Sequence, residues 1–154
     1  MFRGEFHNLL DDKSRLSIPS KFRDQIAQTH EEGPLVLSMG LDQCLWLYPN
    51  DTWKKNEEQL SRLSVLDTEA REFVRAFLGL SVECEVDKQG RIVVPQVLRD
   101  AAGLGRNVVL VGVLNRIEVW DKEKWKSAQV SATQNLSRLS QKLSDKGHLP
   151  ELTL

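Results

Sequence analysis

The sequence DDKSRLSIPSKFRD at residues 11–24 returns as DKQGRIVVPQVLRD at residues 87–100, 76 positions further along the chain. The two stretches align without a gap, and both place an Asp-x-x-x-Arg pattern before a proline and an Arg-Asp pair. The matching residues are Asp11 with Asp87, Arg15 with Arg91, Leu16 with Ile92, Pro19 with Pro95, Phe22 with Leu98, Arg23 with Arg99 and Asp24 with Asp100. Self-similarity at a fixed spacing indicates one structural module used twice.

The repeat continues downstream at a slightly shorter spacing. Residues 44–54, CLWLYPNDTWK, match residues 116–126, RIEVWDKEKWK, so that Tyr48 pairs with Trp120 and Trp53 with Trp125. The internal similarity therefore reaches both halves of the 154-residue chain.

Each copy predicts the same β-rich module with one short helix. A strand (5–10; 81–86), a polar turn (11–14; 87–90) and a second strand (15–18; 91–94) predict a hairpin. Pro19 and Pro95 follow at the first position expected for a helix, where proline is best tolerated. Two apolar strands (34–39 with 44–48; 108–113 with 117–120) complete each module.

Helical patterns separate and follow the two modules. Residues 51–80 predict two helices, the second capped by Asp67 and facing inward through Phe73, Val74, Phe77 and Leu78. We therefore expect an α+β protein. Its expected divisions are a first module (1–50), inter-module helices (51–80), a second module (81–124), and a C-terminal helix and tail (125–154).

The repeated turn carries cations, namely Lys13 and Arg15 in the first copy and Lys88 and Arg91 in the second. An aspartate four residues before each arginine can pair with it across the turn and fix its direction, which suits a bidentate contact with phosphate or guanine. Alternatively, each pair only closes a solvent-exposed turn. The duplication favours nucleic-acid contact.

Bulk charge does not support nucleic-acid binding by one subunit alone. The chain has 21 Lys and Arg against 22 Asp and Glu, a net charge of −1. Residues 1–77 carry a net −3 and residues 78–154 a net +2, so neither half is strongly basic. Affinity would have to come from several subunits binding together.

The sequence lacks the patterns that are typical of several other classes of protein. No run approaches the roughly eighteen apolar residues that a membrane span needs, which predicts a cytoplasmic chain. Cys44 and Cys84 fit reduced core thiols, although a structural pair stays open. The three histidines stand far from metal-ligand spacing and fit surface or strand positions, and no catalytic motif occurs. We expect no enzyme activity, metal, cofactor, small-molecule substrate or membrane partner.

Four segments resemble the MraZ family of bacterial transcription regulators, which contain two SpoVT-AbrB modules. They are MFRGEFHNLLDDKSRLSIPSKFR at the N-terminus, LSRLS at 60–64, RAFLG at 75–79 and DKQGRIVVP at 87–95. The resemblance implies two AbrB-like swapped-hairpin modules that form a pseudo-symmetric barrel, and subunits that close into a homo-oligomeric ring. It also implies a nucleoid-associated repressor that binds short direct repeats in double-stranded promoter DNA. The repressed genes would be its own gene and the division and cell-wall cluster downstream.

The resemblance also assigns residues to the DNA site. It makes Asp11 with Arg15 the first signature pair and Asp87 with Arg91 the second, with Lys13 and Lys88 as further cations. Pro19 and Pro95 support the motif. Ser14 stands where the second copy has Gly90, which predicts a first turn less free to adopt a positive φ.

An alternative function is a protein-interaction module of the antitoxin type. Leu136, Leu139 and Leu143 lie at helical spacing near the C-terminus and could dock a partner helix. Packing of the same stripe on its own module is the other interpretation, and the one we favour.

Overall fold

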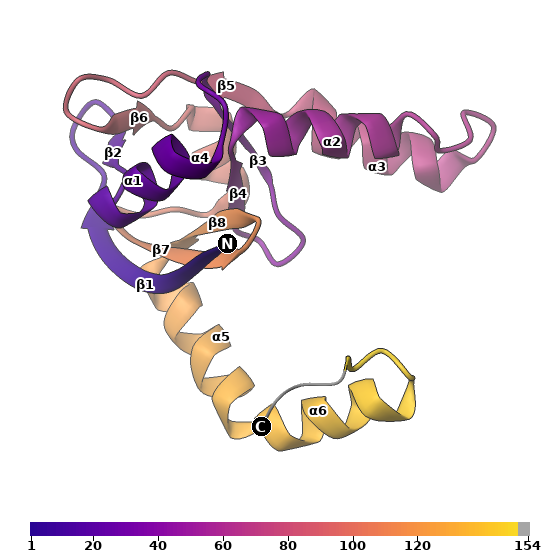
Figure 1. Ribbon diagram of the computed structural model, residues 1–154. Coiled ribbons are helices and arrows are strands. Elements are labelled where there is room, and N and C mark those ends of the chain that lie inside the picture. The colour runs from indigo at the N-terminus through magenta and orange to yellow at the C-terminus, as the bar shows by residue number, and fades with distance from the viewer. Residues whose placement is uncertain (151–154) are drawn as a thin grey trace. The chain divides into compact units, whose positions relative to one another are not determined.

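The computed structural model describes residues 1–150 and divides the chain into two compact units, one ending at Lys122 and one beginning at Glu123 (Figure 1). The strands are β1 (Phe2–Leu9), β2 (Arg15–Ser17), β3 (Leu35–Met39), β4 (Leu45–Tyr48), β5 (Val82–Cys84), β6 (Arg91–Val93), β7 (Asn107–Leu114) and β8 (Arg116–Asp121). The helices are α1 (Ser20–Thr29), α2 (Asn50–Leu60), α3 (Thr68–Gly79), α4 (Gln96–Ala102), α5 (Lys122–Gln134) and α6 (Leu136–Asp145). The protein is thus α+β, as predicted.

The strands of the first unit form two antiparallel sheets. The larger sheet has six strands in the order β1-β7-β8-β4-β3-β5, and β2 and β6 form a separate two-stranded ribbon. The first strand of each module pairs with the third strand of the other, since Phe6 of β1 lies opposite Leu110 of β7 and Val82 of β5 lies opposite Leu37 of β3. The modules therefore exchange strands.

This exchange corrects the two predicted hairpins. A backbone hydrogen bond from Asp11 N to Arg15 O closes the first turn at 3.1 Å, and its counterpart from Asp87 N to Arg91 O closes the second at 2.9 Å. Beyond these bonds the strands separate, because β1 and β5 join the large sheet while β2 and β6 pair with each other. Pairing β2 with β6 places Leu16 and Ile92 side by side in one shared core, at 0% and 1% exposure.

Two pairs of opposed residues mark a pseudo-twofold relation between the modules. Leu16 lies opposite Ile92 in the ribbon, and Trp46 lies opposite Glu118 in the large sheet. In each pair, a residue faces its own counterpart in the other copy of the repeat. The two copies are therefore related by symmetry in space as well as in sequence.

The core lies between the large sheet, the ribbon and helices α1 and α4. Leu16 and Ile92 of the ribbon and Phe22 and Leu98 of the helices are all buried in it. Both cysteines are free and buried, and burial raises the pKa of Cys44 to about 12 and that of Cys84 to about 11.

Helices α2 and α3 cover the opposite face of the sheet at β3 and β4, and Figure 1 shows them as a helical hairpin. Val36 and Tyr48 of the sheet pack with Trp53 of α2 and Phe77 of α3. Asp67 caps α3 as predicted, because its side chain accepts a hydrogen bond from the backbone N–H of Ala70. Phe73, predicted to face inward, is instead 41% exposed and stacks on Phe77 at the edge of this cluster.

A buried ion pair lies on the same face of the sheet. Glu118 is 7% exposed and accepts hydrogen bonds from Arg116 Nη2 and Trp120 Nε1, each at 2.9 Å. The Arg116 guanidinium lies 4.2 Å from the ring centroid of Trp46. The charge of this buried carboxylate is therefore balanced by one arginine.

The second unit consists of α5 and α6. Neither helix buries a side chain, and the chain changes direction at Asn135, where a single long helix was predicted. None of the helices within residues 1–150 is long and apolar enough to cross a membrane.

Candidate nucleic-acid interface

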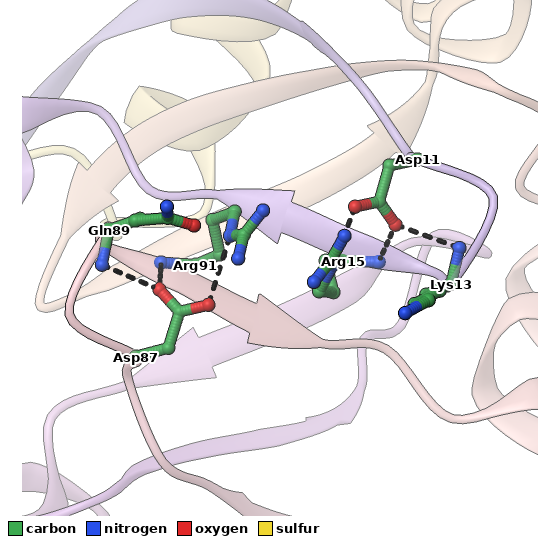
Figure 2. A network of polar contacts seen from close by, with 6 residues as sticks. All are labelled: Asp11, Lys13, Arg15, Asp87, Gln89 and Arg91. Carbon is green, nitrogen blue, oxygen red and sulfur yellow. Dashed lines mark hydrogen bonds and ion pairs between the residues drawn. The ribbon is translucent and has the colours of Figure 1, made fainter.

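The first turn of the repeat is organised around one carboxylate, that of Asp11 (Figure 2). Its Oδ1 accepts hydrogen bonds from the backbone N–H groups of Lys13 and Arg15, both at 2.9 Å. Its Oδ2 accepts a hydrogen bond from Arg15 Nε at 2.6 Å. Asp11 thus fixes both the turn and the direction of the arginine side chain.

The second turn repeats this geometry. Asp87 Oδ1 accepts hydrogen bonds from the backbone N–H groups of Gln89 at 2.9 Å and Arg91 at 3.0 Å, and Oδ2 accepts one from Arg91 Nε at 2.9 Å. Figure 2 shows the two networks on adjacent strands of the ribbon. Lys88, the remaining cation of this turn, is exposed, as is Lys13 in the first turn.

Hydrogen bonds from the turn also keep both aspartates ionised. The backbone N–H of Arg15 is the main cause that lowers the pKa of Asp11 below its usual value of 3.8, and that of Arg91 does the same for Asp87. Each arginine therefore has a permanent anionic partner at neutral pH. Only Nε is used, and among residues 1–150 the terminal Nη groups of Arg15 and Arg91 have no hydrogen-bond partner.

The ribbon brings the two arginines onto one exposed face. Leu16 and Ile92 point into the core, so their neighbours along each strand point outward. Arg15 lies opposite Val93 and Ser17 opposite Arg91, which makes the arginines diagonal neighbours about 7–8 Å apart. Two guanidinium groups with free donors thus share a surface narrow enough to meet adjacent base pairs or phosphates.

The prolines place the helices that support the turns. Pro19 and Pro95 stand immediately before α1 and α4, one residue earlier than predicted, with φ of −51° and −60°. Each accepts, through its carbonyl oxygen, a hydrogen bond from the buried aromatic or aliphatic residue three positions later, Phe22 or Leu98. The helices thus begin at a fixed point after each ribbon strand.

The two turns differ in what packs on them. Ser14 has a φ of 59° and Gly90 one of 76°, so the serine adopts the left-handed conformation despite its side chain. Arg23 lies against Gly90 and donates from Nε to the carbonyl oxygen of Ile18 at 3.0 Å. The corresponding Nε in the second copy of the repeat, that of Arg99, is buried and has no hydrogen-bond partner among the described residues.

Gly90→Ala is expected to destabilise the protein. A Cβ at this position would lie 2.6 Å from Cζ and Nε of Arg23, and the left-handed backbone costs a non-glycine residue about 1–2 kcal/mol. The melting temperature should fall by roughly 2–8 °C in thermal denaturation. Ser14→Ala is the matched control, because Ser14 already has a Cβ, and its melting temperature should stay close to that of the wild type. Equal melting temperatures for the two variants would contradict this account of the turns.

Several residues of this face were not predicted from the sequence. Ser17 and Val93 could have been found, since strand alternation places them beside the arginines. The contact of Arg23 with Gly90 could not, because it joins segments far apart in the sequence.

His30 has a structural role that the sequence did not predict. Its Nδ1 lies 2.9 Å from Asp51 Oδ1 and its ring stacks on Phe2. Burial alone would raise the pKa of Asp51, but hydrogen bonds from His30 and the backbone N–H of Thr52 outweigh it and lower the pKa. Within residues 1–150, no group of three or more His, Cys, Asp or Glu side chains is placed to hold a metal ion.

The fold and the site together define a class of protein in which two interlocked β modules present paired Asp–Arg turns on one ribbon. The chain matches the family described as "MraZ protein, putative antitoxin-like" twice, over residues 1–76 and 77–146. It therefore belongs to the MraZ family.

Relatives of the chain carry the name transcriptional regulator MraZ. The protein of Lachnoclostridium phytofermentans is 42% identical over 96% of this chain and 98% of the relative. Those of Natranaerobius thermophilus and Pediococcus pentosaceus are 41% and 44% identical, over 94% and 96% of this chain and 98% and 99% of the relatives. These names describe transcriptional regulators and not enzymes, in agreement with the prediction from sequence.

Proposed function

We propose that this protein is a sequence-specific transcriptional regulator that binds double-stranded DNA through the outer face of the β2–β6 ribbon. The observation that carries this proposal is the pair of arginines, Arg15 and Arg91. Each is held by an aspartate through Nε, and its Nη groups have no hydrogen-bond partner in the part of the chain that the structure describes. A surface salt bridge alone contributes little to stability, so two such networks on one exposed face favour a binding role. The name of the relatives supports the same function.

Each residue of the site has a proposed role. Arg15 and Arg91 contact guanine edges or phosphates through their Nη groups, and Lys13 and Lys88 contact phosphates. Asp11 and Asp87 orient the arginines. Pro19 and Pro95 support the motif by fixing the helices behind the ribbon.

The proposed architecture is the pseudo-symmetric swapped-hairpin barrel, in which the large sheet and the ribbon enclose one core. The shared core and the exchange of β1 and β5 between modules support it. In this arrangement, residues 1–50 and 81–124 are the two modules, residues 51–80 are the inter-module helices, and residues 125–154 follow as the C-terminal segment.

A homo-oligomeric ring on tandem direct repeats is the proposed functional assembly. The net charge of −1 leaves few unbalanced cations per subunit, so tethering several subunits is needed for affinity. On the basis of the family resemblance, we place the repeats upstream of the protein's own gene, and the protein represses that gene and the division and cell-wall cluster downstream. It would therefore act in the cytoplasm, at the nucleoid.

Binding to this promoter region is expected to depend steeply on salt. Two bound subunits that neutralise two to four phosphates each give a slope of log affinity against log salt of about −4 to −7. Electrophoretic mobility shift titrations at several salt concentrations measure this slope. A scrambled fragment of equal length is the control and should bind more weakly at every salt concentration. Equal affinity for the two fragments would exclude sequence-specific regulation through this site.

A second candidate function is the antitoxin-type interaction module. Leu136, Leu139 and Leu143 on α6 are 66%, 43% and 41% exposed, so the helix carries an apolar stripe. Purification from a native lysate separates the two functions, since a stoichiometric protein partner without promoter DNA would favour the interaction module.

A further inference from the structure

The outer face of the ribbon carries unlike residues at positions that the repeat makes equivalent. Ser17 in the first copy corresponds to Val93 in the second, and Lys21 corresponds to Val97. All four are exposed, with Val93 at 56% and Val97 at 53%. The backbone of the ribbon is pseudo-symmetric, but the side chains on its outer face are not.

The strand pairing gives the two arginines different neighbours. Val93 lies directly opposite Arg15, whereas Ser17 lies directly opposite Arg91. The turns differ in charge as well, because Asp12 in the first corresponds to Lys88 in the second. Each end of the ribbon thus has one arginine and one lysine, but the first adds an apolar side chain and two aspartates, whereas the second adds a hydroxyl group and one aspartate.

Val93 is an exposed apolar side chain beside Arg15 and Arg91, and the DNA major groove offers one apolar group that it could contact. This groove admits a two-stranded β-ribbon, and the apolar group it presents is the C5-methyl of thymine. Cross-strand neighbours have Cβ atoms about 4.5–5.5 Å apart, between one and two base-pair rises of about 3.4 Å. Arg15 and Val93 can therefore reach neighbouring base pairs. A single exposed valine needs no explanation in general, but this one adjoins a guanidinium with free donors.

We propose that Val93 is a specificity-determining residue that contacts a thymine methyl group beside the base pair contacted by Arg15. Because Ser17 cannot make the same contact beside Arg91, each subunit binds its site in one direction. A directional subunit suits repeats that all point the same way, whereas a symmetric one would suit inverted repeats. This inference rests on the proposed DNA-binding function.

The test compares thymine with uracil, which pairs identically but lacks the methyl group. The probe is the promoter fragment of the protein's own gene, prepared once with thymine and once with uracil throughout. Fluorescence anisotropy with the full-length protein at one salt concentration gives Kd for each fragment. Wild type should bind the uracil fragment about fourfold more weakly for each site contacted, as expected for loss of one methyl-sized contact. Val93→Ser should lose about the same affinity for the thymine fragment and show no further loss on uracil.

Two further variants complete the experiment. Val130→Ser removes a valine of α5 that is 47% exposed and outside the ribbon, and it should behave like wild type. Ser17→Val places a valine opposite Arg91 and should increase the ratio of thymine to uracil affinity. It tests the inference independently of the stability of Val93→Ser.

Two results would overturn the inference while leaving the proposed function intact. The first is that wild type binds the thymine and uracil fragments with the same Kd. The second is that Val93→Ser loses as much affinity on the uracil fragment as wild type does. If wild type binds neither fragment better than scrambled DNA, the proposed function fails and this inference fails with it.

Discussion

Arg15→Ala is expected to weaken binding to the promoter fragment by more than tenfold while leaving the fold and the assembly unchanged. The Nη groups of Arg15, which have no hydrogen-bond partner among residues 1–150, can make a bidentate contact that contributes about 1–3 kcal/mol to discrimination between bases. If several subunits bind at once, the loss recurs at each of them. Among residues 1–150, the side-chain hydrogen bond and ion pair of Arg15 go to the partly exposed carboxylate of Asp11, so stability should change little.

Mobility shift titration, together with size measurement and thermal denaturation, tests this expectation. Arg62→Ala is the matched control, because Arg62 is an exposed arginine that also pairs with a carboxylate four residues away, Glu58, but lies outside the ribbon. It should bind DNA like wild type. The corresponding variant Arg91→Ala measures how much the second module contributes to the affinity for DNA. Unchanged affinity of Arg15→Ala would exclude Arg15 from the interface.

The internal repeat made the candidate site predictable in part. An aspartate four residues before an arginine, found twice at a spacing of 76, predicts a turn with an ion pair, and the structure shows both pairs at 2.6 and 2.9 Å. Such contacts are local, so the residues that make them are close in the sequence. The contact of these residues with DNA stays a prediction.

The pairing of the strands could not be predicted in the same way. The alternation Arg15-Leu16-Ser17 indicates which side chain is buried, but many partners would bury it equally well. The hairpin prediction failed because it chose the nearest strand in the sequence. The conformation of Ser14 was also not predicted. The hydrogen bonds that close the turn impose a left-handed backbone there, although a non-glycine residue disfavours a positive φ.

The exchange of strands also determines how the outer face of the ribbon is made. Each end of the ribbon combines residues of both modules, because Arg15 of the first lies opposite Val93 of the second. Two separate modules in one chain would not create this composite surface. The two copies differ at Ser17 and Val93 and agree at Arg15 and Arg91, so the ribbon has two unlike ends on a pseudo-symmetric backbone.

Arg116→Ala is expected to lower the free energy of unfolding by about 3 kcal/mol, the lower end of the usual cost of breaking a buried ion pair. Glu118 is 7% exposed and lies in the sheet opposite Trp46, so its charge cannot be solvated by water when the arginine is removed. The hydrogen bond from Trp120 Nε1 would persist but carries no full charge. The lower end of the range applies because the Arg116 side chain is 23% exposed in the intact pair.

The double variant Arg116→Ala with Glu118→Gln separates loss of charge balance from loss of packing. Glutamine keeps an oxygen that can accept the Trp120 hydrogen bond but removes the buried charge. Chemical denaturation should therefore show the double variant to be more stable than Arg116→Ala alone. If the double variant is instead as unstable as the single one, the destabilisation comes from the lost contact between the guanidinium and Trp46, 4.2 Å from its ring centroid, and not from an unbalanced charge.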